Sequence, residues 1–217
     1  MCGIAGLIHR GKSSNVGEEL QHMLQALKHR GPDSTGYALY ADNDGQNFIL
    51  RFKVGENVGE GSTSVNEDES VYNERKKSVD KKLSELGALV VKEEKLTPYS
   101  YRYEIKFDKD LMEFSKAIES IQSVEILSIG KSLELIKDLG DATVVSERYG
   151  LNKVQGTHGI GHARMATESG VDIKSAHPFW GYPFSDVSVV HNGQLTNYWN
   201  NRRSLENKGM RFMSECD

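Results

Sequence analysis

The chain begins with a segment that constrains its fold strongly. Residues 3–8 read Gly-Ile-Ala-Gly-Leu-Ile, a small and apolar run that starts almost at the chain end and directly follows Cys2. A short continuous run of this kind is typical of a strand that is buried on both faces of a sheet. The sequence therefore predicts a sheet whose first strand carries a cysteine at its start.

The composition indicates a globular protein and excludes several classes. The 217 residues predict one domain or a domain with a large insertion, and 37% hydrophobic against 27% charged residues excludes general disorder. Lys and Arg number 27 against 31 Asp and Glu, so a net charge of −4 favours neither nucleic acid nor an anionic membrane. No apolar run approaches the ~18–20 residues of a membrane helix.

Cysteine use and the N-terminus indicate the compartment. The apolar stretch at 3–8 has no basic region before it, so it does not resemble a signal peptide. Two cysteines, Cys2 and Cys216, cannot form a disulfide framework, and a reducing compartment is then expected. The sequence predicts a cytoplasmic protein.

The first third of the chain predicts a helix and two strands. Apolar residues from Leu20 to Leu27 fall at helical spacing, and the helix should end before Gly31-Pro32. Residues 36–40 and 48–52 predict strands that pair across a turn at 42–45. The polar residues 55–83 are interpreted as a mobile or helical surface excursion.

The middle third predicts a small α+β unit. Residues 88–91 and 101–107 alternate like a hairpin, and residues 111–121 predict a helix that Asp108 or Asp110 caps. A strand at 124–129 follows, and one or two short helices are predicted over 133–139 and 142–149. The whole segment 41–154 is interpreted as an insertion without obvious chemistry.

Cys2 is the first candidate for catalysis. Removal of Met1 would leave a cysteine with both a thiol and a free α-amine, whose reference pKa is about 7.7–8.0. Such an amine can act as the base for its own side chain, as in N-terminal nucleophiles. The alternative is a small hydrophobic residue at a strand start.

Three further clusters carry polar groups near turns. Residues 29–36 combine Arg30 and Asp33 with Gly31-Pro32, which also fits a charged turn with a local salt bridge. The alternation at 160–164 predicts a strand that delivers Arg164 into a cleft, where a guanidinium suits a carboxylate. Asn192-Gly193 follows a buried strand and offers donors for an oxyanion, or else forms an ordinary turn.

Four histidines in the last third raise the question of zinc: His158, His162, His177 and His191. The His-x3-His spacing on a strand places two rings on one face. No carboxylate or cysteine completes a ligand set, so the sequence does not favour a metal site.

The order of these motifs resembles a known family. Cys2-Gly3-Ile4, the segments 29–33 (His-Arg-Gly-Pro-Asp) and 161–164 (Gly-His-Ala-Arg), His191-Asn192-Gly193 and the final Ser-Glu-Cys-Asp together resemble the class II glutamine amidotransferases, which are N-terminal-nucleophile hydrolases. The segments 164–169, 177–179 and 191–199 look most like the amidotransferase subunit or domain of glutamate synthases. The resemblance covers both ends of the chain and skips about 41–154.

The resemblance implies a fold and a reaction. The fold would be an α+β four-layer αββα sandwich, with residues 1–217 forming a partial amidotransferase domain. Cys2 would attack the glutamine amide to give a thioester and ammonia, while Asn192 and Gly193 hold the oxyanion. Substrate-binding roles fall on four residues. Arg164 would hold the α-carboxylate, which Thr167 would also contact, and Asp217 would hold the α-ammonium. Arg30 would have a supporting role on the turn that covers the nucleophile.

The resemblance also implies a partner. Ammonia would pass to a glutamate synthase that uses FMN and an iron–sulfur cluster with 2-oxoglutarate, and this chain itself carries no cofactor motif. In the family, Ser-Glu-x-Asp is followed by a helix and several strands, so an end at Asp217 suggests a domain truncated at its C-terminus. The alternatives are the amidotransferase part of an aminosugar or asparagine synthase system, and a non-catalytic fragment with a regulatory or assembly role.

Overall fold

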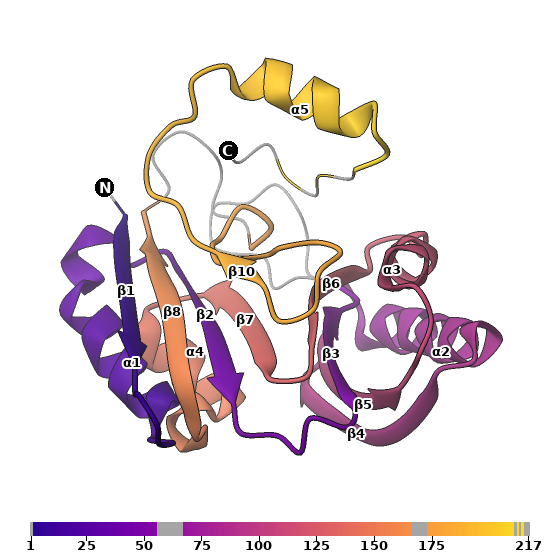
Figure 1. Cartoon of the computed structure of the whole chain (residues 1–217), viewed down its shortest axis with the longest axis horizontal. Coiled ribbons are helices and arrows are strands. Elements are labelled where there is room, and N and C mark those ends of the chain that lie inside the picture. Colours follow the sequence, from indigo (N-terminus) through magenta and orange to yellow (C-terminus); the bar gives the residue numbers. More distant parts are fainter. Residues whose placement is uncertain (1, 56–66, 166–172, 211, 213, 215–217) are drawn as a thin grey trace.

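Two antiparallel sheets of four strands each organise the computed structural model of the chain (Figure 1). The structure describes residues 2–55, 67–165, 173–210, 212 and 214. Within these residues the fold is mixed α+β, and helices and strands follow one another along the chain. In chain order they are β1 (Gly3–Ile8), α1 (Val16–Ala26), η1 (Lys28–Arg30), β2 (Ser34–Ala41), β3 (Phe48–Lys53), α2 (Glu69–Leu86), β4 (Leu89–Thr97), β5 (Ser100–Lys106), α3 (Leu111–Glu119), β6 (Glu125–Gly130), β7 (Leu133–Leu139), α4 (Ala142–Tyr149), η2 (Leu151–Lys153), β8 (Gly156–Arg164), β9 (Phe179–Trp180), β10 (Ser188–Val189) and α5 (Tyr198–Glu206).

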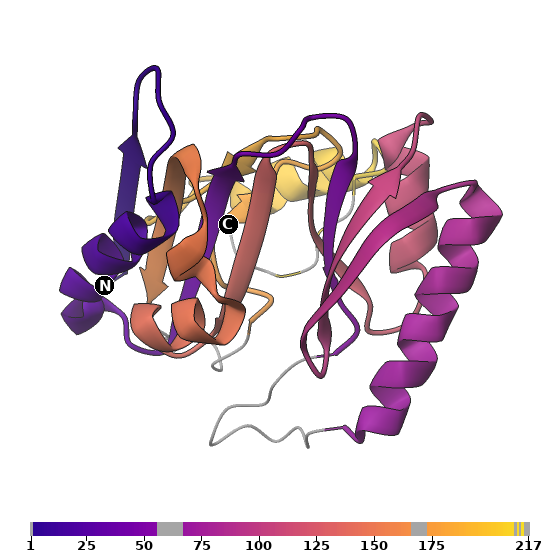
Figure 2. The ribbon, with the colours of Figure 1, turned by 90° about the horizontal axis from the view of Figure 1, so that it is seen from below.

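The first sheet has the strand order β1-β8-β2-β7, and α1 and α4 cover one of its faces (Figure 2). Their shared core contains Leu20 and Leu24 of α1, Tyr37 and Leu39 of β2, and Val145 of α4. The predicted strand at 3–8 is confirmed as β1. It lies at the sheet edge.

The prediction that β1 is buried on both faces is wrong. Ile4 is 42% exposed and Ile8 is 69% exposed, whereas Ala5 packs into the core. The two faces of an edge strand are covered independently, and here the helices cover only the face of Ala5. A short apolar run does not by itself reveal whether a second layer covers the other face.

The second sheet has the order β4-β5-β3-β6 and packs against α2 and α3. Phe52, Tyr103 and Phe114 are fully buried in this core. The predicted β4–β5 hairpin is confirmed, and so is the helix after it, which Asp110 caps by accepting the backbone N–H of Glu113 at 2.8 Å. Within the polar segment 55–83, α2 begins at Glu69, and residues 56–66 lie outside the described part.

The predicted pairing of the strands at 36–40 and 48–52 is wrong. Both strands exist, but β2 lies between β8 and β7 in the first sheet, and β3 lies between β5 and β6 in the second. Leu39 packs with α1 and α4, whereas Phe52 packs with α2 and α3. The turn between them therefore crosses from one sheet to the other.

Residues 133–139 form the strand β7 and not the predicted helix, whereas 142–149 form the predicted helix α4. β7 pairs with β2 from Ser34↔Leu139 to Tyr40↔Leu133. Both faces of β7 are buried, so its charged and apolar residues do not follow the regular alternation that identifies a half-exposed strand. Residues 41–154 thus supply the whole second sheet and also part of the first, and their status as an insertion stays a prediction.

Buried ion pairs connect the two sheets. Glu134 of β7 accepts hydrogen bonds from the Nε atoms of Arg51 on β3 and Arg102 on β5, each at 2.9 Å. On the same strand, Lys137 lies 3.3 Å from Glu125 of β6, which also pairs with Lys53 of β3 at 3.0 Å. A buried carboxylate is stable only when it is paired, so these contacts hold the sheets in one arrangement.

The pKa of Glu134 reflects this environment. Burial alone would raise the pKa of the carboxyl, but the neighbouring guanidinium groups of Arg51 and Arg102 outweigh it and lower the pKa to about 2. A depressed carboxyl pKa stabilises the fold above its unfolded value of about 4.5, and this contribution is lost as the pH falls from about 4.5 towards 2.

We expect Glu134→Gln to lower the free energy of unfolding by about 3–5 kcal/mol at pH 7, because the buried guanidinium of Arg51 loses its counter-charge and the half-buried guanidinium of Arg102 keeps the more distant Glu94. Below pH 4.5 the variant should also lose stability less steeply than wild type, by up to about 1.4 kcal/mol per pH unit. Urea unfolding at a series of pH values measures both effects. Glu94→Gln removes a more exposed partner of Arg102 and should change little; equal losses in the two variants would contradict the prediction.

We expect Leu24→Ala to cost about 2–5 kcal/mol of stability, because Leu24 is fully buried between α1 and β8, where it packs against Gly161. Met23 precedes it on the same helix and is 40% exposed. Met23→Ala should therefore stay within about 0.5 kcal/mol of wild type. Thermal or urea unfolding distinguishes these results, and a similar cost for both would show that α1 does not pack as described.

Candidate active site

The end of the β1–β8 pair brings Cys2 beside Arg164. The antiparallel register joins Gly3 to Ala163, so Cys2 and Arg164 stand next to that pair at the same end of the sheet. Cys2 is half-buried, and its Sγ lies 4.0 Å from the carbonyl oxygen of Met165, a weak sulfur hydrogen bond. The thiol is therefore held at the sheet end and remains partly open to solvent.

The turn at 191–193 lies against the same strand end. The side-chain Nδ2 of Asn192 donates a hydrogen bond to the backbone oxygen of Cys2 at 3.1 Å, across 190 residues of sequence. Asn192 and Gly193 are exposed. The structure thus brings together Cys2 and the Asn192-Gly193 turn, which the sequence links only through the family resemblance.

Arg164 and the turn after α1 complete this region. Arg164 is buried at the end of β8, opposite Ser34 of β2, and its carbonyl accepts the backbone N–H of Asp33 at 3.1 Å. Arg30 ends η1 and is half-buried, and the next residue, Gly31, packs directly on the backbone of Ala163 and Arg164. The cluster at 29–36 is therefore more than a local turn, since it buttresses the strand that carries Arg164.

Two predicted site residues, Thr167 and Asp217, lie outside the described residues. Their roles stay predictions.

A cluster of histidines adjoins the site. From the sequence these residues were weighed as metal ligands and belong to segments that carry the family resemblance, but no role in the site was predicted for their rings. His162 is 1% exposed and His177 is 5% exposed, with ring centroids 5.0 Å apart, and the rings of His177 and His191 are 6.4 Å apart. The alternation at 160–164 places His162 on the same face as Arg164, but no local spacing signals His177. Within the described part of the chain, no three His, Cys, Asp or Glu side chains are arranged to hold a metal ion.

His162 is an uncharged member of this cluster. Burial lowers its pKa to about 4, and the nearby Arg164 and His191 act in the same direction. Among the described residues, neither ring nitrogen of His162 has a hydrogen-bond partner. His177 lies over β2, where an added Cβ at Gly36 would overlap the carbonyl oxygen of His177. The cluster thus packs tightly on the face of the sheet that carries Arg164.

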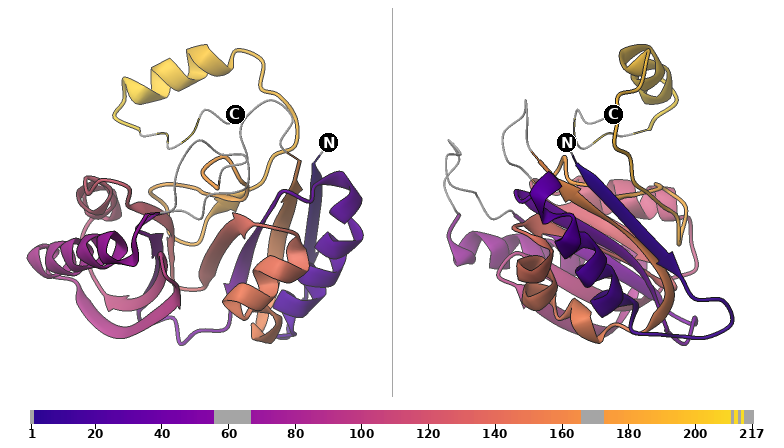
Figure 3. Two further views of the ribbon diagram at one scale, coloured as in Figure 1. Left: turned by 180° about the vertical axis from the view of Figure 1, so that it is seen from behind. Right: turned by 90° about the vertical axis from the view of Figure 1, so that its left-hand side faces the viewer.

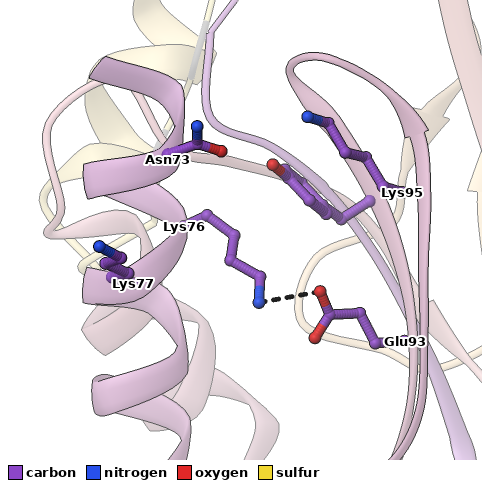
Figure 4. A pocket seen from close by; sticks show the side chains of 6 residues that line it. Asn73, Lys76, Lys77, Glu93 and Lys95 are labelled. Carbon is purple, nitrogen blue, oxygen red and sulfur yellow. Dashed lines mark ion pairs between the residues drawn. The ribbon is translucent and has the colours of Figure 1, made fainter. Parts of the chain in front are cut away.

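One hollow of about 610 Å³ is lined by His177 and His191 of the histidine cluster and is bounded by β6, β7, the β9–β10 hairpin and the segment around α5. Of the predicted site residues that the structure describes, Cys2, Arg164 and Asn192 are not among those that line it. Figure 3 shows α5 standing over this side of the molecule. A smaller hollow, of about 350 Å³, lies between α2 and β4 (Figure 4). There Lys76 is already paired with Asp80 and Glu93, each at 2.8 Å, so two carboxylates balance the charge of this lysine.

The helices give no sign of a membrane span. Among the described residues, none is both long enough and apolar enough to cross a bilayer.

Comparison with known proteins places the chain in a family, although no family profile matches it. It is 37% identical over 225 residues to the "Putative glutamine amidotransferase" of Methanothermobacter thermautotrophicus, covering all of this chain and 69% of that protein. It is 32% identical over 219 residues to the glutamine amidotransferase-like protein GlxB of Rhizobium meliloti, covering all of this chain and 66% of that protein. The chain therefore spans about two thirds of the length of these relatives.

A more distant similarity indicates the class. The chain is 34% identical over 115 residues to a glutamine–fructose-6-phosphate aminotransferase of Methanococcus maripaludis, which covers 52% of this chain and 19% of that enzyme. Together with the fold and the placement of Cys2, these similarities define a class of protein. The chain belongs to the class II glutamine amidotransferase family.

We expect Gly36→Ala to lower the free energy of unfolding by about 1–3 kcal/mol, because the new methyl group would overlap the backbone of His177. Gly6→Ala is the matched control in the same sheet, since its Cβ would stand 3.3 Å from a side-chain methyl of Ile160. Urea unfolding should find less than about 1 kcal/mol for this control. Unchanged stability in Gly36→Ala would mean that His177 does not pack on β2.

Proposed function

We propose that this protein hydrolyses the side-chain amide of glutamine to glutamate and ammonia, with Cys2 as the nucleophile. The hydrogen bond from Asn192 to the backbone of Cys2 carries this proposal, because it gathers the proposed nucleophile and oxyanion donor at one sheet end. Arg164 ends the neighbouring strand, and its guanidinium fits the α-carboxylate of an amino acid. Glutamine amidotransferase names among the relatives support the same reaction.

The reaction follows from an N-terminal cysteine. After removal of Met1, the α-amine of Cys2 accepts the thiol proton, and the thiolate attacks the amide carbon of glutamine. A carbon–sulfur bond forms, and the proton passes to the leaving nitrogen as the carbon–nitrogen bond breaks and ammonia departs. Water then attacks the thioester, which releases glutamate and returns the proton to sulfur.

Asn192 and Gly193 would stabilise the charge that develops on the amide oxygen. Donors of this kind typically contribute about 10²–10³ in kcat because they act where charge appears in the transition state. In the structure Asn192 Nδ2 already lies 3.1 Å from the backbone oxygen of Cys2, which supports its placement beside the proposed nucleophile.

The remaining proposed roles concern substrate binding. Arg164 would hold the α-carboxylate and Asp217 the α-ammonium of glutamine. Thr167 would also contact the carboxylate, and Arg30 would have a supporting role on the turn that covers the nucleophile. The buried position of Arg164 at the end of β8 suits a guanidinium that binds a desolvated anion.

We further propose the four-layer αββα arrangement of the N-terminal-nucleophile hydrolases. Two observations support it: each four-stranded sheet carries helices on one face, and buried ion pairs connect the two sheets.

The proposed recipient of ammonia is a glutamate synthase-type protein. The segments 164–169, 177–179 and 191–199 support this choice, and the aminosugar enzyme resembles only about half of the chain. With the amide-¹⁵N form of glutamine, 2-oxoglutarate, a reductant and a synthase of this type, the label should enter the amino group of new glutamate. Labelled ammonia that escapes to solvent at the same rate with and without the synthase would argue against this partner.

We expect Cys2→Ala to abolish ammonia release while glutamine still binds, because only the nucleophile is removed. Ammonia release and isothermal calorimetry with glutamine measure these two properties. Intact mass after exposure to a diazo-ketone analogue of glutamine should show loss of Met1 and one adduct on Cys2 of the wild type. Met23→Ala should behave as wild type, whereas retained Met1 with normal activity would contradict the mechanism.

A further inference from the structure

We propose that His177 is a positioning residue for the turn at residues 191–193, which carries the proposed oxyanion donors Asn192 and Gly193. Its Nδ1 accepts a hydrogen bond from the backbone N–H of His191 at 3.3 Å. His191 directly precedes Asn192, whose side chain bonds to Cys2. One ring nitrogen thus anchors the backbone of the turn that faces the nucleophile. This inference rests on the proposed glutaminase reaction.

The anchor is effective because His177 is itself immobilised. Its side chain is 5% exposed, and its backbone carbonyl packs against Gly36 of β2. Its ring contacts Phe179 edge-on with centroids 4.7 Å apart and lies 5.0 Å from the ring of His162 on β8. The acceptor nitrogen is therefore fixed against β2 and β8. Arg164 ends β8 and pairs there with the start of β2.

The geometry requires a particular tautomer. A neutral imidazole has one N–H donor and one acceptor nitrogen, so a ring that accepts at Nδ1 carries its proton on Nε2. The opposite tautomer would place two N–H groups against each other and would release the turn.

Loss of this acceptor should affect the chemical step more than binding. Asn192 and Gly193 act on the proposed transition-state charge, whereas the glutamine carboxylate is assigned to Arg164. A displacement of about 1 Å in a catalytic group can cost about 10²-fold in rate. An interaction made only in the transition state lowers kcat and kcat/KM together and leaves KM nearly unchanged.

Three variants test the proposal. His177→Phe keeps the ring volume and removes the acceptor, so kcat for ammonia release should fall about 10–100-fold with KM within about threefold. His177→Asn restores an acceptor oxygen near the position of Nδ1 and should recover most of that loss. His158→Phe is the control, because His158 stacks on Tyr40 elsewhere on β8 with centroids 3.9 Å apart and a phenyl ring can replace it.

The outcomes separate this inference from the proposed function. If wild type releases ammonia and His177→Phe does too at the same kcat, or if His177→Asn is as impaired as a folded His177→Phe, the positioning role is wrong. If wild type releases no ammonia from glutamine, the proposed function fails first. In either case, ¹⁵N NMR of the wild-type imidazoles tests the contact without any variant: a protonated Nε2 and an unprotonated, hydrogen-bonded Nδ1 on His177 are expected, and a protonated Nδ1 would overturn the inference.

Discussion

The buried carboxylates between the two sheets are the interaction on which the rest of the structure depends. Glu134 of β7 binds Arg51 and Arg102 of the second sheet, and Glu125 of β6 binds Lys137 of the first. Each contact joins charges that could not remain buried alone, since desolvation of an unpaired ion costs several kcal/mol. The observed placement of the sheets is therefore the one in which Glu125 and Glu134 meet their cations.

This placement determines what β7 does for the site. β7 pairs with β2, β2 pairs with β8, and β8 pairs with β1. Three neighbouring strand pairs therefore connect the ion pairs of β7 with β1, at whose start Cys2 lies. Arg164, His162 and the packing surface for His177 lie along this path. Two hydrogen bonds then hold the turn at Asn192: the backbone N–H of His191 donates to His177 of the histidine cluster, and the side chain of Asn192 donates to the backbone of Cys2.

Elements with clear local signals were predicted well. The helix at 16–26, the Asp110 cap and the hairpin of β4 and β5 follow from periodicity and capping chemistry, which act over a few residues. β7 was mistaken for a helix because its Glu134, Lys137 and Asp138 are buried beside partners on other elements, so its charged residues follow neither the helical nor the strand period. The strands β2 and β3 were assigned correctly, yet their pairing was not, because the choice between hairpin and crossover depends on which helices cover each strand.

The sequence by itself determined the candidate chemistry: a cysteine at position 2, an arginine at a strand end and an Asn-Gly turn, in an order that resembles one family. Side-chain chemistry and local spacing are properties of the chain, so they can be recognised without coordinates. Only the tertiary structure decided that Asn192 reaches the backbone of Cys2, that Gly31 buttresses Arg164, and that His177 holds the turn at His191. These contacts join residues from separate elements, and their geometry arises only when the sheets, with their buried charges paired, have packed together.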